Sequence, residues 1–209
     1  MKITETIARK VIECVDAGLV KGQGKPVPGQ MCVEAAVCYA LGLPHGDDPA
    51  CVSRSLRALK IRLNDSNWSS NEARAKGLRR LAVAQLGSAG VLDDKEFRRR
   101  VVDLAIRKSV PDALRAADSI CKDDHKRQAM LDAAARCEQA MLDAAARCEK
   151  EGTRESALEG KKAAYADAAA YADADARDKS LAAFCEAVVQ ILIDMKAPGC
   201  KWLYLTESV

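Results

Sequence analysis

The sequence predicts an all-α fold, a compact helical bundle with a long antiparallel helical hairpin. Apolar residues recur every three or four positions in most segments between the glycines and prolines, which is the period of an amphipathic helix. Hydrophobic residues make up 49% of the chain but aromatic residues only 4%, because alanine supplies much of the apolar count. Alanine is the strongest helix former, and small side chains favour closely packed helices over a sheet built on bulky residues.

The first half of the chain is expected to form five shorter helices, separated by glycine, proline or polar breaks. Residues 31–41 are almost entirely apolar except for Glu34, which predicts a central, buried helix. Asp48 followed by Pro49 is typical of an N-cap and first turn. Ser69 or Ser70 is expected to cap the next helix, with Glu72 placed to complete a capping box on Ser69. The expected helices cover residues 3–15, 31–41, 49–63, 70–86 and 93–106.

The second half changes character after Pro111. Residues 112–150 contain no glycine or proline, and residues 153–196 are interrupted only by Gly160. At the ideal helical rise each stretch would extend about 60 Å, and the turn at Gly152 would make them an antiparallel hairpin. We therefore expect an N-terminal bundle over 1–110 and a hairpin over 111–209. The C-terminal end of the hairpin is expected to pack back on the bundle, with a core segment at 184–195 and a short extended tail at 200–205.

The tip of the predicted hairpin holds an internal repeat. The eleven residues Gln128–Glu138 recur letter for letter as Gln139–Glu149, and 164–168 are echoed by 170–174. Eleven residues are almost three helical turns, so such an insertion rotates the following helical face by only about 20°. We expect an arm of variable length. It would be a solvated spacer, or alternatively a surface for protein contact or homo-oligomerisation.

Composition narrows the classes of partner. The net charge is +3 with 30% charged residues, which is not the basic footprint of a dedicated nucleic-acid-binding domain. No apolar run approaches the roughly 18 residues needed to span a bilayer, so no membrane partner is expected. The first five residues lack the apolar core of a signal peptide. The nine cysteines are odd in number and lie mostly inside helical patterns, which indicates free thiols in the cytoplasm.

The best candidate binding site lies where a basic helix meets a polar break. Arginine forks and amides suit phosphate and ribose, and a tryptophan offers a stacking surface for a base. The alternative is a solvated basic face followed by a polar loop that caps the next helix. The candidate ligand-binding residues are Arg54, Arg57, Lys60, Arg62, Asn64, Asp65, Asn67 and Trp68.

Glu34 stands alone on its apolar helix, and a carboxylate buried without a partner is costly. It is therefore expected to have a partner, either Arg54, Arg57 or a bound ligand. Together with His45 and Asp47, Glu34 forms a possible additional pocket.

The cysteines suggest two further chemistries. Cys32, Cys38, His45 and Cys51 carry zinc-ligand side chains, but no pair has the two-to-four-residue spacing of a zinc site, and buried structural cysteine is the commoner state. Cys32 with His45 would make a nucleophile and base, with no third residue or oxyanion donor to complete them. Walker, dinucleotide, zincin and nucleophile-elbow motifs are absent. We assign no catalytic residue, metal or cofactor.

Three segments resemble a known family. They are Cys32-x18-Cys51 with Gly42, Pro44, His45, Asp47 and Pro49 inside it, the run Leu56–Asp65, and the ending Val188–Trp202. Together they are similar to a family of uncharacterised helical proteins encoded by bacteriophages, prophages and some bacteria. The likeness covers roughly the first hundred and last twenty residues and skips the repeats. It implies a phage-related context, in which small accessory proteins bind a host protein or sequester a nucleotide immune signal.

The functional expectation is a non-catalytic, phage-type accessory protein in the host cytoplasm. It would bind a small anionic, nucleotide-like ligand, in keeping with anti-defence sequestration of an immune signal. One alternative is a protein-interaction module that blocks or recruits a host factor through the hairpin. The other is an enzyme that depends on Cys32, His45 or Asp47.

Overall fold

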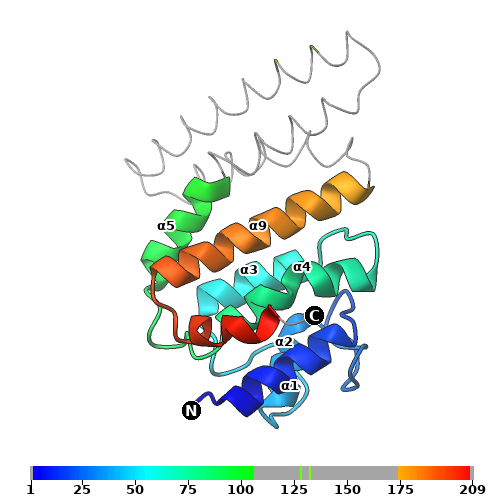
Figure 1. Ribbon diagram of the computed structural model, residues 1–209, viewed down its shortest axis with the longest axis vertical. Helices are drawn as coiled ribbons and strands as arrows, with labels where there is room; N and C mark the ends of the chain where they lie inside the picture. Colours follow the sequence, from blue (N-terminus) through cyan, green and yellow to red (C-terminus); the bar gives the residue numbers. More distant parts are fainter. Residues whose placement is uncertain (1, 106–127, 129–131, 133–173, 208–209) are drawn as a thin grey trace. The chain divides into compact units, whose positions relative to one another are not determined.

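The computed structural model describes residues 2–105, 128, 132 and 174–207 (Figure 1). Within these residues the regular structure is helical, which confirms the all-α class for the described part. The predicted hairpin and its repeats lie largely outside the described residues. The helices are α1 (Glu5–Asp16), α2 (Val33–Ala40), α3 (Arg54–Asn64), α4 (Asn71–Ala84), α5 (Asp94–Leu104), α9 (Ala174–Asp194) and the 3-10 helix η2 (Pro198–Thr206).

The chain divides into two compact units. The first combines Met1–Val101 with Leu181–Val209, and the second is Val102–Ser180. Every buried apolar side chain of the described residues belongs to the first unit. The core of the described structure is therefore built by the N-terminal helices together with the end of the sequence.

Short polar side chains begin most of the helices. Thr4 and Ser53 accept hydrogen bonds from the backbone amides three residues later, at 3.4 and 3.3 Å. Ser70 does the same for α4, at 3.0 Å. The predicted start at Asp48 is wrong, because α3 begins only after Ser53. Glu72 hydrogen-bonds to its own backbone and to Ser70, and these bonds lower the pKa of its carboxyl.

Helix α2 is the central helix, as expected. Seven of its eight residues are buried, and it packs against α1, α3 and α4. Its first turn is closed from two sides, because Cys32 Sγ accepts from Ala35 N at 3.3 Å and Asn64 Oδ1 accepts from Val33 N at 3.2 Å. The end of α3 thus helps to fix the start of α2.

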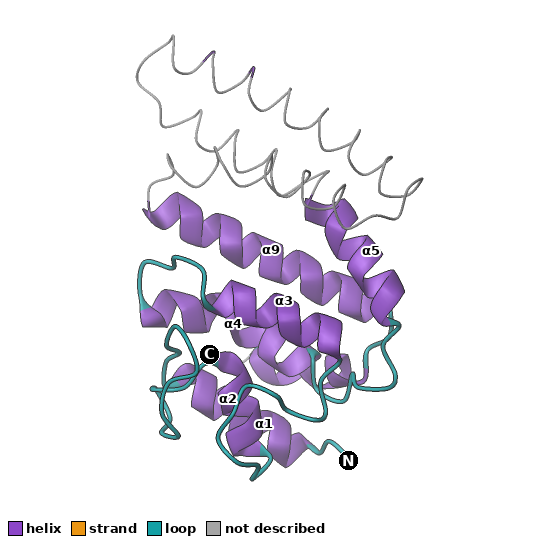
Figure 2. Ribbon diagram, turned by 180° about the vertical axis from the view of Figure 1, so that it is seen from behind, coloured by secondary structure: helices purple, strands orange, loops and turns teal. Residues whose placement is uncertain are grey.

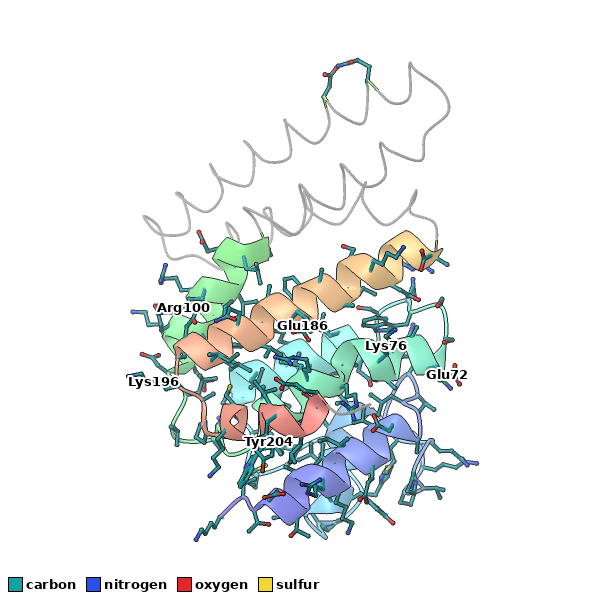
Figure 3. All side chains as sticks on the ribbon, in the orientation of Figure 1. Glu72, Lys76, Arg100, Glu186, Lys196 and Tyr204 are labelled. Carbon is teal, nitrogen blue, oxygen red and sulfur yellow. The ribbon has the colours of Figure 1, made fainter. Side chains whose placement is uncertain are left out.

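The C-terminal segment completes the bundle. In both ribbon views the part of α9 that belongs to the first unit, residues 181–194, runs alongside α3 and α4 (Figures 1 and 2). Glu186, labelled on α9 in Figure 3, pairs with Arg80 of α4 at 3.1 Å. The expected extended tail is wrong, because these residues form η2, which packs on α4 and α1. Pro198 at its first turn is preorganised for a helix. Glu5 of α1 accepts hydrogen bonds from Arg9 of the same helix and from Tyr204 of η2, and these bonds lower the pKa of its carboxyl.

Gly199 allows η2 to approach the backbone of α4. A Cβ built there would lie 2.6 Å from Ala84 O and 2.8 Å from Leu86 N, and it would also meet Val83 O. We expect Gly199→Ala to lower the free energy of unfolding by about 2 kcal/mol or more, because backbone atoms cannot give way as flexible side chains do. Urea unfolding followed by circular dichroism measures this change.

Gly46→Ala is the matched control. A Cβ at Gly46 would meet its nearest atoms only at 3.8 Å, and its φ is not in the left-handed region. Equal loss of stability in the two variants would contradict the close approach at Gly199.

Candidate functional site

The interior of the first unit contains an ion pair that is shielded from solvent. Glu34 on α2 and Lys60 on α3 are both 0% exposed, and Lys60 Nζ lies 3.6 Å from Glu34 Oε1. The expected partner of Glu34, Arg54 or Arg57, is therefore wrong. Lys60 lies one turn beyond Arg57 on α3 and takes the inward position.

Gln85, at the C-terminal end of α4, is also fully buried and interacts with the carboxyl of Glu34. Among the described residues, five buried atoms of this group have no hydrogen-bond partner of ordinary length. They are both carboxylate oxygens of Glu34, Nζ of Lys60 and the two amide atoms of Gln85. We refer to Glu34, Lys60 and Gln85 as the buried polar cluster.

The environment of the cluster opposes charge on both partners. Burial raises the pKa of Glu34, and the nearby Lys60 is the main influence that opposes this shift. Burial lowers the pKa of Lys60, and Glu34 is again the main opposing influence. Each ion is therefore tolerated because the other is present.

The side chains of the predicted basic face of α3 do not all point to solvent. Arg54 and Arg62 are exposed, whereas Lys60 is buried. Arg57 is partly buried and reaches back to the preceding loop, where its Nε donates to Asp47 O at 2.6 Å. Its terminal nitrogens pair with the carboxylates of Asp47 at 2.9 Å and Asp48 at 3.3 Å.

Polar side chains at the end of α3 form hydrogen bonds with the loop before α2 and with the start of α2. Asn64 is 1% exposed. Its Nδ2 donates a hydrogen bond to Val20 O at 2.9 Å, and its Oδ1 accepts one from Val33 N. Asp65 Oδ1 accepts from Gly22 N at 2.8 Å. These two side chains hold the loop before α2 against the end of α3.

Trp68 packs inside the bundle. It is 7% exposed, and its indole Nε1 donates to Leu63 O at 2.8 Å. Its ring lies over Gly77, where an added Cβ would be 2.5 Å from the ring atom Cζ3. The ring therefore has little exposed surface on which a base could stack. Asn67 is exposed, whereas Lys60, Asn64 and Trp68 are buried. The eight predicted residues therefore do not form one continuous surface.

Of the four residues in the possible zinc set, the three cysteines are buried, whereas His45 is exposed. Cys32, Cys38 and Cys51 are buried, and burial raises the pKa of each thiol, to about 11 for Cys38. His45 is exposed, with Nε2 3.1 Å from Gly24 O. In the described ranges, no three His, Cys, Asp or Glu side chains are grouped to hold a metal ion. A raised thiol pKa disfavours the thiolate that a cysteine nucleophile requires.

Sequence reasoning missed the roles of Lys60 and Gln85, although a signal was present. Lys60 lies four residues after Leu56 and three before Leu63, and both leucines are buried. This spacing places Lys60 on the apolar stripe of α3. Gln85 continues the buried run 81–86 at the end of α4.

Comparison of the chain with protein-family models, with curated proteins and with solved structures finds no match. None of the described helices is long and apolar enough to cross a membrane.

Replacing Lys60 by Met should leave the Glu34 carboxylate buried without an opposing charge. We expect Lys60→Met to lower the free energy of unfolding by about 3–5 kcal/mol. The double variant Glu34→Met/Lys60→Met should recover most of that loss, because both ions are gone. Urea unfolding of the two variants measures the difference.

Glu96→Gln is the surface control, because Glu96 pairs with Arg99 and Arg100 at the surface of α5. It should change stability little. A loss in Lys60→Met no larger than in Glu96→Gln would show that the buried pair does not govern stability.

Thiol reactivity should report the raised pKa values. Burial raises the pKa to about 11 for Cys38 and Cys200 and to about 12 for Cys185. At pH 8 we expect iodoacetamide to label these thiols more than about a hundredfold more slowly than the same thiols in the unfolded chain. Labelling rates resolved by peptide mass spectrometry test this expectation. Folded-state labelling of Cys185 within tenfold of the unfolded rate would contradict it.

Proposed function

We propose that the protein is a non-catalytic binding protein for a small anionic, nucleotide-like ligand, held on the exposed face of α3. The observation that carries this proposal is the pair of exposed arginines, Arg54 and Arg62, on either side of exposed Ala58. In the described part of the chain, no ion-pair partner of either arginine is found. We call these three residues the α3 arginine face.

The spacing of the arginine face suits one small anion. Positions 54, 58 and 62 follow one another every four residues, so they drift by only about 40° per step around the helix. The two arginines are separated by about 12 Å along the axis, with only the methyl group of Ala58 between them. Both guanidinium groups can lean over that small residue and donate to one phosphate or to two linked phosphates.

Arg57 would be an auxiliary group rather than a primary ligand. It already donates to Asp47, and it also pairs with Asp48, whose side chain is 75% exposed. A phosphate near α3 would compete with this exposed carboxylate for the guanidinium. Lys60 and Trp68 contribute to the proposal only by shaping α3 and its following turn, because both are buried.

The biological setting remains part of the proposal. A phage-type role in sequestering a nucleotide immune signal rests on the sequence resemblance. The alternative of a host-protein contact or homo-oligomerisation through the hairpin concerns residues outside those described. The Cys/His-dependent enzyme is less favoured, because Cys32 Sγ accepts from Ala35 N and its thiol pKa is raised.

Replacing both exposed arginines should abolish most of the binding. We expect Arg54→Ala/Arg62→Ala to weaken binding at least about tenfold, because each charge-assisted hydrogen bond contributes about 1.5–3 kcal/mol. Isothermal titration calorimetry with ATP, a cyclic dinucleotide and inorganic pyrophosphate as probes measures the affinity.

Lys95→Ala/Arg98→Ala is the charge-matched control, because it removes two exposed positive charges from α5. Its affinity should stay within about twofold of the unaltered protein at 0.15 M salt. Failure of all three probes to bind, or equal binding by both double variants, would contradict the proposed site.

A further inference from the structure

The buried polar cluster has more hydrogen-bonding capacity than its members satisfy among themselves. Five of its atoms, from α2, α3 and the end of α4, have no hydrogen-bond partner of ordinary length and lie in a fully buried region. The 3.6 Å between Lys60 Nζ and Glu34 Oε1 exceeds the roughly 2.7–2.9 Å of a charge-assisted hydrogen bond. Such buried groups are normally paired with protein or with ordered water.

The chemistry of these atoms limits what can bind them. Lys60 offers three N–H donors and Gln85 two, while Glu34 and the Gln85 carbonyl offer only acceptors. An added cation would be repelled by the ammonium of Lys60, and an added anion by the carboxylate of Glu34. The fitting species is a small neutral molecule that donates and accepts at the same time.

We propose that the buried polar cluster is an internal hydration site, in which at least one water molecule bridges Glu34, Lys60 and Gln85. Buried waters of this kind make two to four hydrogen bonds to otherwise unpaired polar groups. The water would receive a proton from Lys60 or Gln85 and donate to the carboxylate of Glu34. It thereby stabilises the charged form of the pair without any contact to the surface.

Full burial gives this water a measurable property. All three side chains are 0% exposed, so the water leaves only when the helices around it separate. Its residence time is then far longer than that of a surface water. It should contribute to the magnetic relaxation dispersion of water oxygen-17 and deuterium.

A high-resolution crystal structure of the full chain tests the site directly. We expect a water within about 2.6–3.2 Å of at least two of the five atoms. Lys60 Nζ bonded directly to both Glu34 and Gln85, with no molecule between them, would overturn the proposal. Density for a molecule other than water would also overturn it.

Relaxation dispersion tests the same site in solution. The variant Glu34→Met/Lys60→Met/Gln85→Met removes every polar atom of the cluster, and it should lose dispersion amplitude equivalent to at least one water. Glu96→Gln should keep the full amplitude. A folded triple variant with unchanged amplitude would overturn the proposal. If the triple variant does not fold, the crystal structure of the unaltered chain decides the proposal by the criterion given for it.

Discussion

The described structure depends on one buried ion pair, Glu34 with Lys60, and on the amide of Gln85 beside it. Three helical segments that are distant in sequence each contribute one member. Because a buried charge without its partner is strongly unfavourable, these segments cannot slide or rotate past one another without a large loss of free energy. Apolar packing would hold the helices together with less restriction, whereas the polar cluster favours one arrangement of α2, α3 and α4.

The Glu34–Lys60 pair also determines which side of α3 faces solvent. At about 100° per residue, Arg54 and Arg62 lie about 120° and 160° around the helix from Lys60. An inward Lys60 therefore turns both arginines toward solvent, where the structure places them. Asn64 and Asp65 reinforce this orientation by binding the start of α2 and the loop before it. The interior charge and the proposed ligand face are thus two consequences of one helix orientation.

Within the described residues, the sequence predicts the positions of the helices well and the buried polar cluster less well, for physical reasons. Helical periodicity identifies buried faces, so the central position of α2 and the need of Glu34 for a partner could be foreseen. The sequence predicts Lys60 on the basic ligand-binding face of its helix, because lysine is almost never fully buried unless it is paired. The burial of Trp68 depends on the small residue Gly77 nine positions later, and no local pattern reports such a contact. The start of α3 at Ser53 rather than Asp48 shows that two adequate N-cap signals compete.

Native-state hydrogen exchange of the backbone amides tests the role of the buried pair most directly. If the cluster joins α2, α3 and the end of α4 into one cooperative unit, their slowest amides should exchange only through global unfolding, with a common free energy and a common denaturant dependence. Exchange of α3 through a separate opening, well below the free energy of global unfolding, would show that Lys60 and Glu34 do not bind these helices together.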